Sequence, residues 1–108
     1  LPEQALYIVT DKGIIIISGC SHSGIVKICR HASGLFPGRD IHLAAGGFHL
    51  GAKSDKDINS ICEELLSMRV EKAAPSHCSG SSAIMIFRKY FGENFVELNL
   101  GDEYILSR

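Results

Sequence analysis

The sequence predicts an α/β fold in which one mixed β-sheet is covered by about three helices. Two observations lead to this prediction. Apolar runs rich in β-branched residues alternate along the chain with segments whose apolar residues recur at helical spacing. A hairpin opens the chain and three strand–loop–helix units follow, an order that is typical of parallel strands with helical crossovers. The 108 residues suffice for one small domain, residues 1–108.

The first two strands are predicted to form the hairpin. They run from Ala5 to Thr10 and from Gly13 to Ser18, and Asp11-Lys12-Gly13 between them is a turn signal. The second strand is a run of four isoleucines, which indicates burial on both faces. It ends in a glycine-rich loop that carries Cys20 and His22. Ligands of open α/β sheets bind at this end of the strands.

The next two units repeat this arrangement. A helix follows Gly24, with Ser23 placed to cap it, and Gly34 and Pro37 end it. A second buried strand, Asp40 to Gly46, leads into a loop with His49. Ser54 and Asp57 resemble a capping box for the following helix. The apolar stripe of that helix consists of Ile58, Ile61, Cys62, Leu65 and Met68.

The last unit begins with a short strand from Val70 to Pro75 and a loop that carries His77. A helix from about Ser82 to Phe91 follows, and its apolar face is formed by Ala83, Ile84, Phe87 and Phe91. Phe95 to Leu100 and Tyr104 to Ser107 are predicted to be a closing pair of strands.

Three histidines therefore follow three strands at nearly equal spacing, close to the ~30 residues of a βαβ unit. If these strands are neighbours, His22, His49 and His77 emerge at the same end of one sheet. With the thiols of Cys20 and Cys78, they are residue types that bind zinc, iron or manganese. His31 and His42 do not share this placement, since they lie in a predicted helix and inside a predicted strand.

Other interpretations of the same residues stay open. Each histidine could only orient its loop, His49 above all because its neighbours are hydrophobic. The helix N-termini at the loops could hold a phosphate group without any metal. Cys20 could be a nucleophile whose pKa the following helix lowers, although side chains two residues apart do not converge without a bend in the loop. Cys29 and Cys62 lie on apolar helical faces and are expected in the core.

Composition limits the classes of function. The net charge of −1 gives no electrostatic reason to expect nucleic acid as a partner. The longest apolar run is far shorter than the ~20 residues of a membrane span. Four cysteines without a CxxC pair favour free thiols in a reducing compartment, so we expect a cytoplasmic protein.

Three sequence blocks resemble the C-terminal half of metallo-β-lactamase-fold hydrolases. The resemblance is closest to the subgroup related to 7,8-dihydropterin-6-methyl-4-(β-D-ribofuranosyl)aminobenzene-5′-phosphate synthase. The blocks are DKGIIIISGCSHSGIVKI (Asp11 to Ile28), GGFHL (Gly46 to Leu50) and PSHCSG (Pro75 to Gly80). They occur in the order and spacing of similar proteins, with Ser79 where threonine is usual.

This resemblance implies half of an αβ/βα sandwich with one or two metal ions, commonly zinc. By motif, His77 matches the last metal histidine of the superfamily, and Cys20 stands where an aspartate usually bridges two metals. The resemblance implies that His22 is a further ligand or a catalytic residue. His49 is a ligand or a catalytic residue that hydrogen-bonds the substrate or the metal-bound water. The implied substrate is a small molecule, and a phosphorylated one would suit the loops.

The chain departs from the family pattern in one respect, because the HxHxDH motif of the N-terminal half is absent. We therefore expect a C-terminal portion of a metal-dependent hydrolase that is inactive alone. Its partner would be the missing N-terminal half, or a second copy across an exposed sheet face. The alternative function is a non-catalytic α/β domain that binds a phosphate-bearing ligand or a partner chain.

Overall fold

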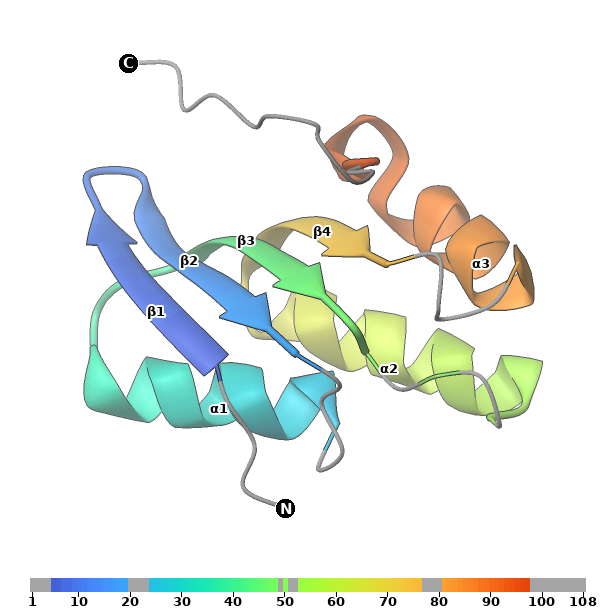
Figure 1. Cartoon of the computed structure of the whole chain (residues 1–108), viewed down its shortest axis with the longest axis horizontal. Helices are drawn as coiled ribbons and strands as arrows, with labels where there is room; N and C mark the ends of the chain where they lie inside the picture. Colours follow the sequence, from blue (N-terminus) through green and yellow to red (C-terminus); the bar gives the residue numbers. More distant parts are fainter. Residues whose placement is uncertain (1–4, 20–23, 49, 51–52, 77–80, 98–108) are drawn as a thin grey trace.

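The computed structural model describes residues 5–19, 24–48, 50, 53–76 and 81–97 (Figure 1). Within these residues the chain forms a four-stranded sheet, three α-helices and a short 3-10 helix. The elements in chain order are β1 (Ala5–Thr10), β2 (Gly13–Ser18), α1 (Ile25–Leu35), β3 (Ile41–Gly46), α2 (Asp55–Ser67), β4 (Val70–Pro75), α3 (Ser81–Phe91) and η2 (Gly92–Asn94). The α/β class predicted from the sequence is confirmed.

The sheet is mixed, as predicted, and its strand order β1-β2-β3-β4 follows the chain. β1 pairs with β2 in antiparallel orientation, while β2, β3 and β4 are parallel. The connections explain this difference. A two-residue turn can join only antiparallel strands, and parallel strands need a crossover such as α1 or α2.

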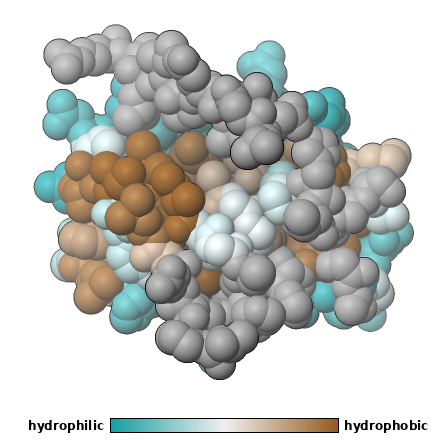
Figure 2. Space-filling view, viewed as in Figure 1, coloured by the Kyte–Doolittle hydropathy of each residue, from teal (hydrophilic) through white to brown (hydrophobic). Residues whose placement is uncertain are grey.

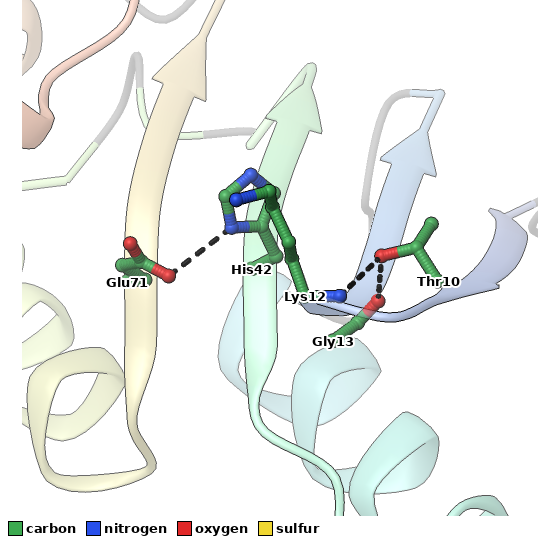
Figure 3. A network of polar contacts seen from close by, with 5 residues as sticks. All are labelled: Thr10, Lys12, Gly13, His42 and Glu71. Atoms are coloured by element: carbon green, nitrogen blue, oxygen red, sulfur yellow. Dashed lines mark hydrogen bonds and ion pairs between the residues drawn. The ribbon is translucent and has the colours of Figure 1, made fainter. Parts of the chain in front are cut away.

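The turn between β1 and β2 is closed by a threonine side chain. The Thr10 hydroxyl donates a hydrogen bond to the Gly13 carbonyl at 2.7 Å and accepts one from the Lys12 backbone N–H at 3.1 Å (Figure 3). Gly13 has φ 126°, and an added Cβ would lie 2.5 Å from the Asp40 carbonyl oxygen. The start of β2 thus packs directly against the backbone that leads into β3, which only glycine permits.

α1 and α2 cover one face of the sheet, and α3 packs against α2 and the edge strand β4 (Figure 1). The apolar sides of these helices and the facing strand residues form one buried cluster, which includes Ile14, Ile16, Ile25, Ile41, Phe48, Ile58, Leu65, Val70 and Phe87. The opposite face carries a second, smaller cluster of Ile15, Leu43, Ala45 and Ala74, with Val96 packed against it. Because both faces of the central strands are apolar, β2 and β3 appear in the sequence as nearly continuous hydrophobic runs.

The N-cap predicted from the sequence is found for α2 but not for α1. The Ser54 hydroxyl accepts a hydrogen bond from the Asp57 backbone N–H at 3.2 Å and caps α2, as predicted. For α1 the prediction is wrong, because the helix begins at Ile25 and its N-cap is Gly24, without a side-chain cap. Ser23, the expected cap, lies outside the described residues.

The chain returns to the sheet after α3. Phe95 forms a parallel bridge with Ala73, and the Val96 backbone N–H donates to the Ala73 carbonyl at 2.8 Å. This is the beginning of the predicted strand from Phe95 to Leu100; its remainder and the strand from Tyr104 to Ser107 lie outside the described residues. In the described ranges, no helix is both long enough and apolar enough to cross a membrane.

Candidate metal site

The candidate site lies where the three parallel strands end. In the sheet register, Ser18 of β2 pairs with Gly46 of β3, and Gly46 pairs with Pro75 of β4. Each of these residues is the last of its strand. Neighbouring strands lie about 4.8 Å apart, so the outer two ends are separated by roughly 10 Å. The three segments that carry the histidines therefore leave the sheet side by side, at one edge.

Backbone hydrogen bonds continue this register beyond the strands. The Gly47 N–H donates to the Ser18 carbonyl at 3.3 Å, and the Ser76 N–H donates to the Gly46 carbonyl at 2.8 Å. Gly46 itself has φ 121°, and a Cβ at this position would lie 1.9 Å from the Ser18 carbonyl oxygen. The segments after β2, β3 and β4 are thus held to one another from their first residues.

The candidate ligands themselves follow directly after these strand ends. Cys20, His22, His49 and His77, the residues expected to hold metal or to act in catalysis, lie outside the described residues, as does Cys78. Among the residues that the structure describes, no three histidine, cysteine or acidic side chains form a group that could hold a metal ion. The structure therefore places the strand ends that precede these four residues in the chain, namely Ser18, Gly46 and Pro75.

The residues on either side of position 49 are anchored in the core. Phe48 and Leu50 are 0% and 1% exposed and belong to the cluster between sheet and helices. The Phe48 ring lies 5.5 Å from the ring of Phe87 in α3, and Phe87 stacks on Phe91 at 5.8 Å. The segment after β3 is thereby packed against the helix that follows the His77 loop. The sequence block GGFHL pointed to His49 but gave no sign that Phe48 packs on Phe87, a contact that the structure shows.

The other two histidines lie away from the candidate site, as predicted. His42, in β3, is 4% exposed, and its Nδ1 lies 3.1 Å from Glu71 Oε2 in β4 (Figure 3). Both residues are near the amino ends of their strands, at the edge opposite Ser18 and Pro75. His31, in α1, is exposed, and its ring lies 6.2 Å from the ring of Tyr7.

Two of the four thiols are core residues, as the apolar helical faces predicted. Cys29 and Cys62 are both 0% exposed and are not in disulfides. Burial raises the pKa of each thiol from 9.0 to about 12, and the charge of Glu63 adds to the effect at Cys62. Since the thiolate is the nucleophile and the metal ligand, neither of these two cysteines is suited to catalysis or metal binding near neutral pH.

The helix N-termini at this edge differ in their suitability for an anion. α1 and α3 begin immediately after the His22 and His77 loops, and neither has an acidic residue in its first turn. α2 carries Asp55 and Asp57 there. Because an acidic first turn neutralises the positive end of the helix dipole, α1 and α3 suit a phosphate group better than α2.

Comparison with known proteins gives two relatives in sequence. No family model matches the chain. It is 37% identical, over 92% of its length, to 7,8-dihydropterin-6-methyl-4-(β-D-ribofuranosyl)-aminobenzene-5′-phosphate synthase of Methanocaldococcus jannaschii. It is 38% identical, over 68% of its length, to an uncharacterized protein of the same organism. The chain spans 34% and 27% of these two relatives, about a third of their length.

A solved structure agrees with these sequence relatives. It is a metal-dependent hydrolase of the β-lactamase superfamily, which superposes with a TM-score of 0.88 and 33% sequence identity. The superposition covers 96% of this chain and 40% of the hydrolase. The resemblance recognised from the three sequence blocks is thus confirmed. The chain is related in sequence to the Methanocaldococcus jannaschii synthase named above, and it has the fold of the β-lactamase superfamily of metal-dependent hydrolases.

Proposed function

We propose that the chain is the C-terminal part of a metal-dependent hydrolase and supplies one side of its metal site. The observation that carries the proposal is the register of Ser18, Gly46 and Pro75, which starts three histidine-bearing segments at adjacent points of one sheet edge. Thiolate and imidazole ligands match zinc, and the fold neighbour is a metal-dependent enzyme. Cys20, His22 and His77 would hold the metal.

The chain's own residues have distinct roles in this proposal. The metal, when bound, supplies a Lewis acid that lowers the pKa of water and polarises the scissile bond. Cys20, His22 and His77 would hold the metal at the sheet edge, and His49 would donate a hydrogen bond to the substrate. The N-termini of α1 and α3 support a small phosphorylated substrate, since their first turns lack acidic residues. A phosphate group is also part of the name of the synthase relative.

Zinc titration of the complete product of the gene that encodes this chain tests the proposal. We expect one tight site by calorimetry, and we expect His22→Ala or His77→Ala to weaken zinc binding by more than the ~10- to 100-fold that the loss of an outer contact of a metal ligand causes. His31→Ala is the matched control, because this histidine is exposed on α1 and should leave zinc binding unchanged. Residues 1–108 alone are expected to bind zinc weakly and to lack hydrolase activity.

The result also separates the proposal from its alternatives. Phosphate binding that persists in His22→Ala and His77→Ala, without any zinc site, would favour a non-catalytic phosphate-binding domain. Rapid alkylation of a thiol near neutral pH would favour a thiol enzyme. The reactive residue would then be Cys20 or Cys78, because the pKa values of Cys29 and Cys62 are raised to about 12.

The sheet face opposite the helices is proposed to pack against the part of the hydrolase that lies outside these 108 residues. Leu6, Ile8 and Ile17 on this face are 57%, 41% and 45% exposed, and the register places them beside buried Ile15. Figure 2 shows the resulting apolar surface over β1 and β2. The occupant is inferred from length, because the hydrolase neighbour has more than half of its chain beyond the superposed part. Helices already cover the other face.

Ile17→Lys distinguishes a covered face from a free one. In the complete gene product we expect a loss of at least about 3 kcal/mol in unfolding free energy, because the ammonium group would be buried without a partner. In residues 1–108 alone the change should stay within about 0.5 kcal/mol. Met85→Lys, at a position 71% exposed on α3, should be neutral in both. Equal and mild effects of Ile17→Lys would contradict the proposal, and a dimer of residues 1–108 that this variant dissociates would point to a second copy instead.

A further inference from the structure

Gly46, the last residue of β3, has no room for a side chain. With φ 121°, its added Cβ would lie 1.9 Å from the Ser18 carbonyl oxygen, 2.9 Å from the Ser18 carbonyl carbon and 3.1 Å from the Ser18 nitrogen. All three are backbone atoms, which cannot rotate away as the end of a flexible side chain can. Any side chain at position 46 must therefore push the end of β3 away from the end of β2.

Gly46 and Gly47 together also link the ends of the neighbouring strands by backbone hydrogen bonds. On one side, Gly47 donates to the Ser18 carbonyl at 3.3 Å; on the other, Ser76 donates to the Gly46 carbonyl at 2.8 Å. The first bond lies two residues before His49, and the second lies at Ser76, immediately before His77. A shift of Gly46 would consequently change the spacing of all three segments that leave the sheet at this edge.

We infer that Gly46 is a positioning residue for the metal site, and this inference rests on the proposed function. Its missing side chain lets the ends of β2 and β3 approach closely enough for one metal ion to be shared by ligands that follow β2 and β4. Metal sites depend on such outer contacts, whose loss typically weakens metal binding by about 10- to 100-fold. We expect a loss in that range for Gly46→Ala.

Gly13 provides a matched control at the other edge of the sheet. It too has a positive φ, 126°, and its added Cβ would meet a backbone carbonyl oxygen, that of Asp40, at 2.5 Å. It lies at the turn between β1 and β2, beside the amino end of β3 (Figure 3). Gly13→Ala therefore introduces the same kind of strain and the same kind of clash, but away from the histidine-bearing segments.

The experiment compares Gly46→Ala with Gly13→Ala in the complete gene product. For each variant, the urea midpoint of unfolding and the zinc dissociation constant by competition with a chelating dye are measured. We expect both variants to unfold at lower urea, and only Gly46→Ala to bind zinc about 10- to 100-fold more weakly. Should Gly46→Ala fail to fold, Ser76→Pro replaces it, because proline cannot donate the 2.8 Å bond to Gly46.

The possible outcomes are distinct. A folded Gly46→Ala protein with the zinc affinity of the unmodified protein overturns the inference and leaves the proposed function standing. An equal loss of zinc affinity in Gly13→Ala also overturns it, since the effect would then follow general stability. Absence of zinc binding in the unmodified protein instead removes the proposed function.

Discussion

Phe87→Ala is expected to lower the free energy of unfolding by about 3–5 kcal/mol, the range for removing a buried aromatic ring. Phe87 is fully buried and contacts the rings of Phe48 and Phe91 at 5.5 and 5.8 Å. Its loss would leave a cavity between α3 and the segment that follows β3. Small domains have only about 5–15 kcal/mol of stability in total, so the variant should lose a large fraction of it.

Urea denaturation followed by circular dichroism measures this effect. Met85→Ala is the control on the same helix, because Met85 is 71% exposed and its replacement should change stability by no more than about 0.5 kcal/mol. The loss of unfolding free energy for Phe87→Leu should lie between the losses for Phe87→Ala and Met85→Ala. A loss below about 1 kcal/mol for Phe87→Ala would contradict the packing of α3 against the segment after β3.

Stability is expected to fall steeply between about pH 9 and pH 12, because two thiols are buried. The pKa of Cys29 and of Cys62 is raised from 9.0 to about 12 in the folded chain. Above pH 9 an unfolded thiol loses its proton while the folded thiol keeps it, so rising pH favours the unfolded state. Their stabilising contribution is complete below about pH 9 and decreases toward pH 12. Each thiol should remove about 1.4 kcal/mol per pH unit in this window.

The measurement is the free energy of unfolding at pH 8 and at pH 10, in the native sequence and in a Cys29→Ala/Cys62→Ala variant. The native sequence should lose about 2.5 kcal/mol more than the variant over this interval. Tyr7 changes the profile only at higher pH, since burial and the neighbouring Cys29 raise its pKa above 10. Identical pH profiles for the two proteins would show that the buried thiols are not the cause.

Local patterns were sufficient for most of the fold. The isoleucine run of β2, the Asp-Lys-Gly turn and the spacing of Ile58, Cys62 and Leu65 each depend on residues close in sequence, and the structure agrees with them. The cap of α1 was mispredicted because serine is a favoured N-cap residue, whereas the helix begins after a glycine whose backbone has a positive φ.

The candidate site was predictable only in part. The sequence indicates that histidine-bearing segments follow three strands, and the strand order places the ends of those strands side by side. The sequence does not reveal which atoms of these segments are in contact. Nothing local shows that Gly46 touches the Ser18 backbone, or that Phe48 packs on Phe87, since these contacts join residues far apart in sequence. For the same reason the pairing of His42 with Glu71, 29 positions away, had no sequence signal.

The strand order β1-β2-β3-β4 also bears on how the chain is made. Each strand pairs with the one synthesised just before it, so every newly exposed strand meets an edge that already exists. Among the strands that the structure describes, none has to be inserted between two others. The β1–β2 hairpin joins segments close in sequence and so has a small loop-closure cost, whereas the parallel pairs must wait for their helical crossovers and form more slowly. The sheet can therefore grow in step with translation, one strand at a time.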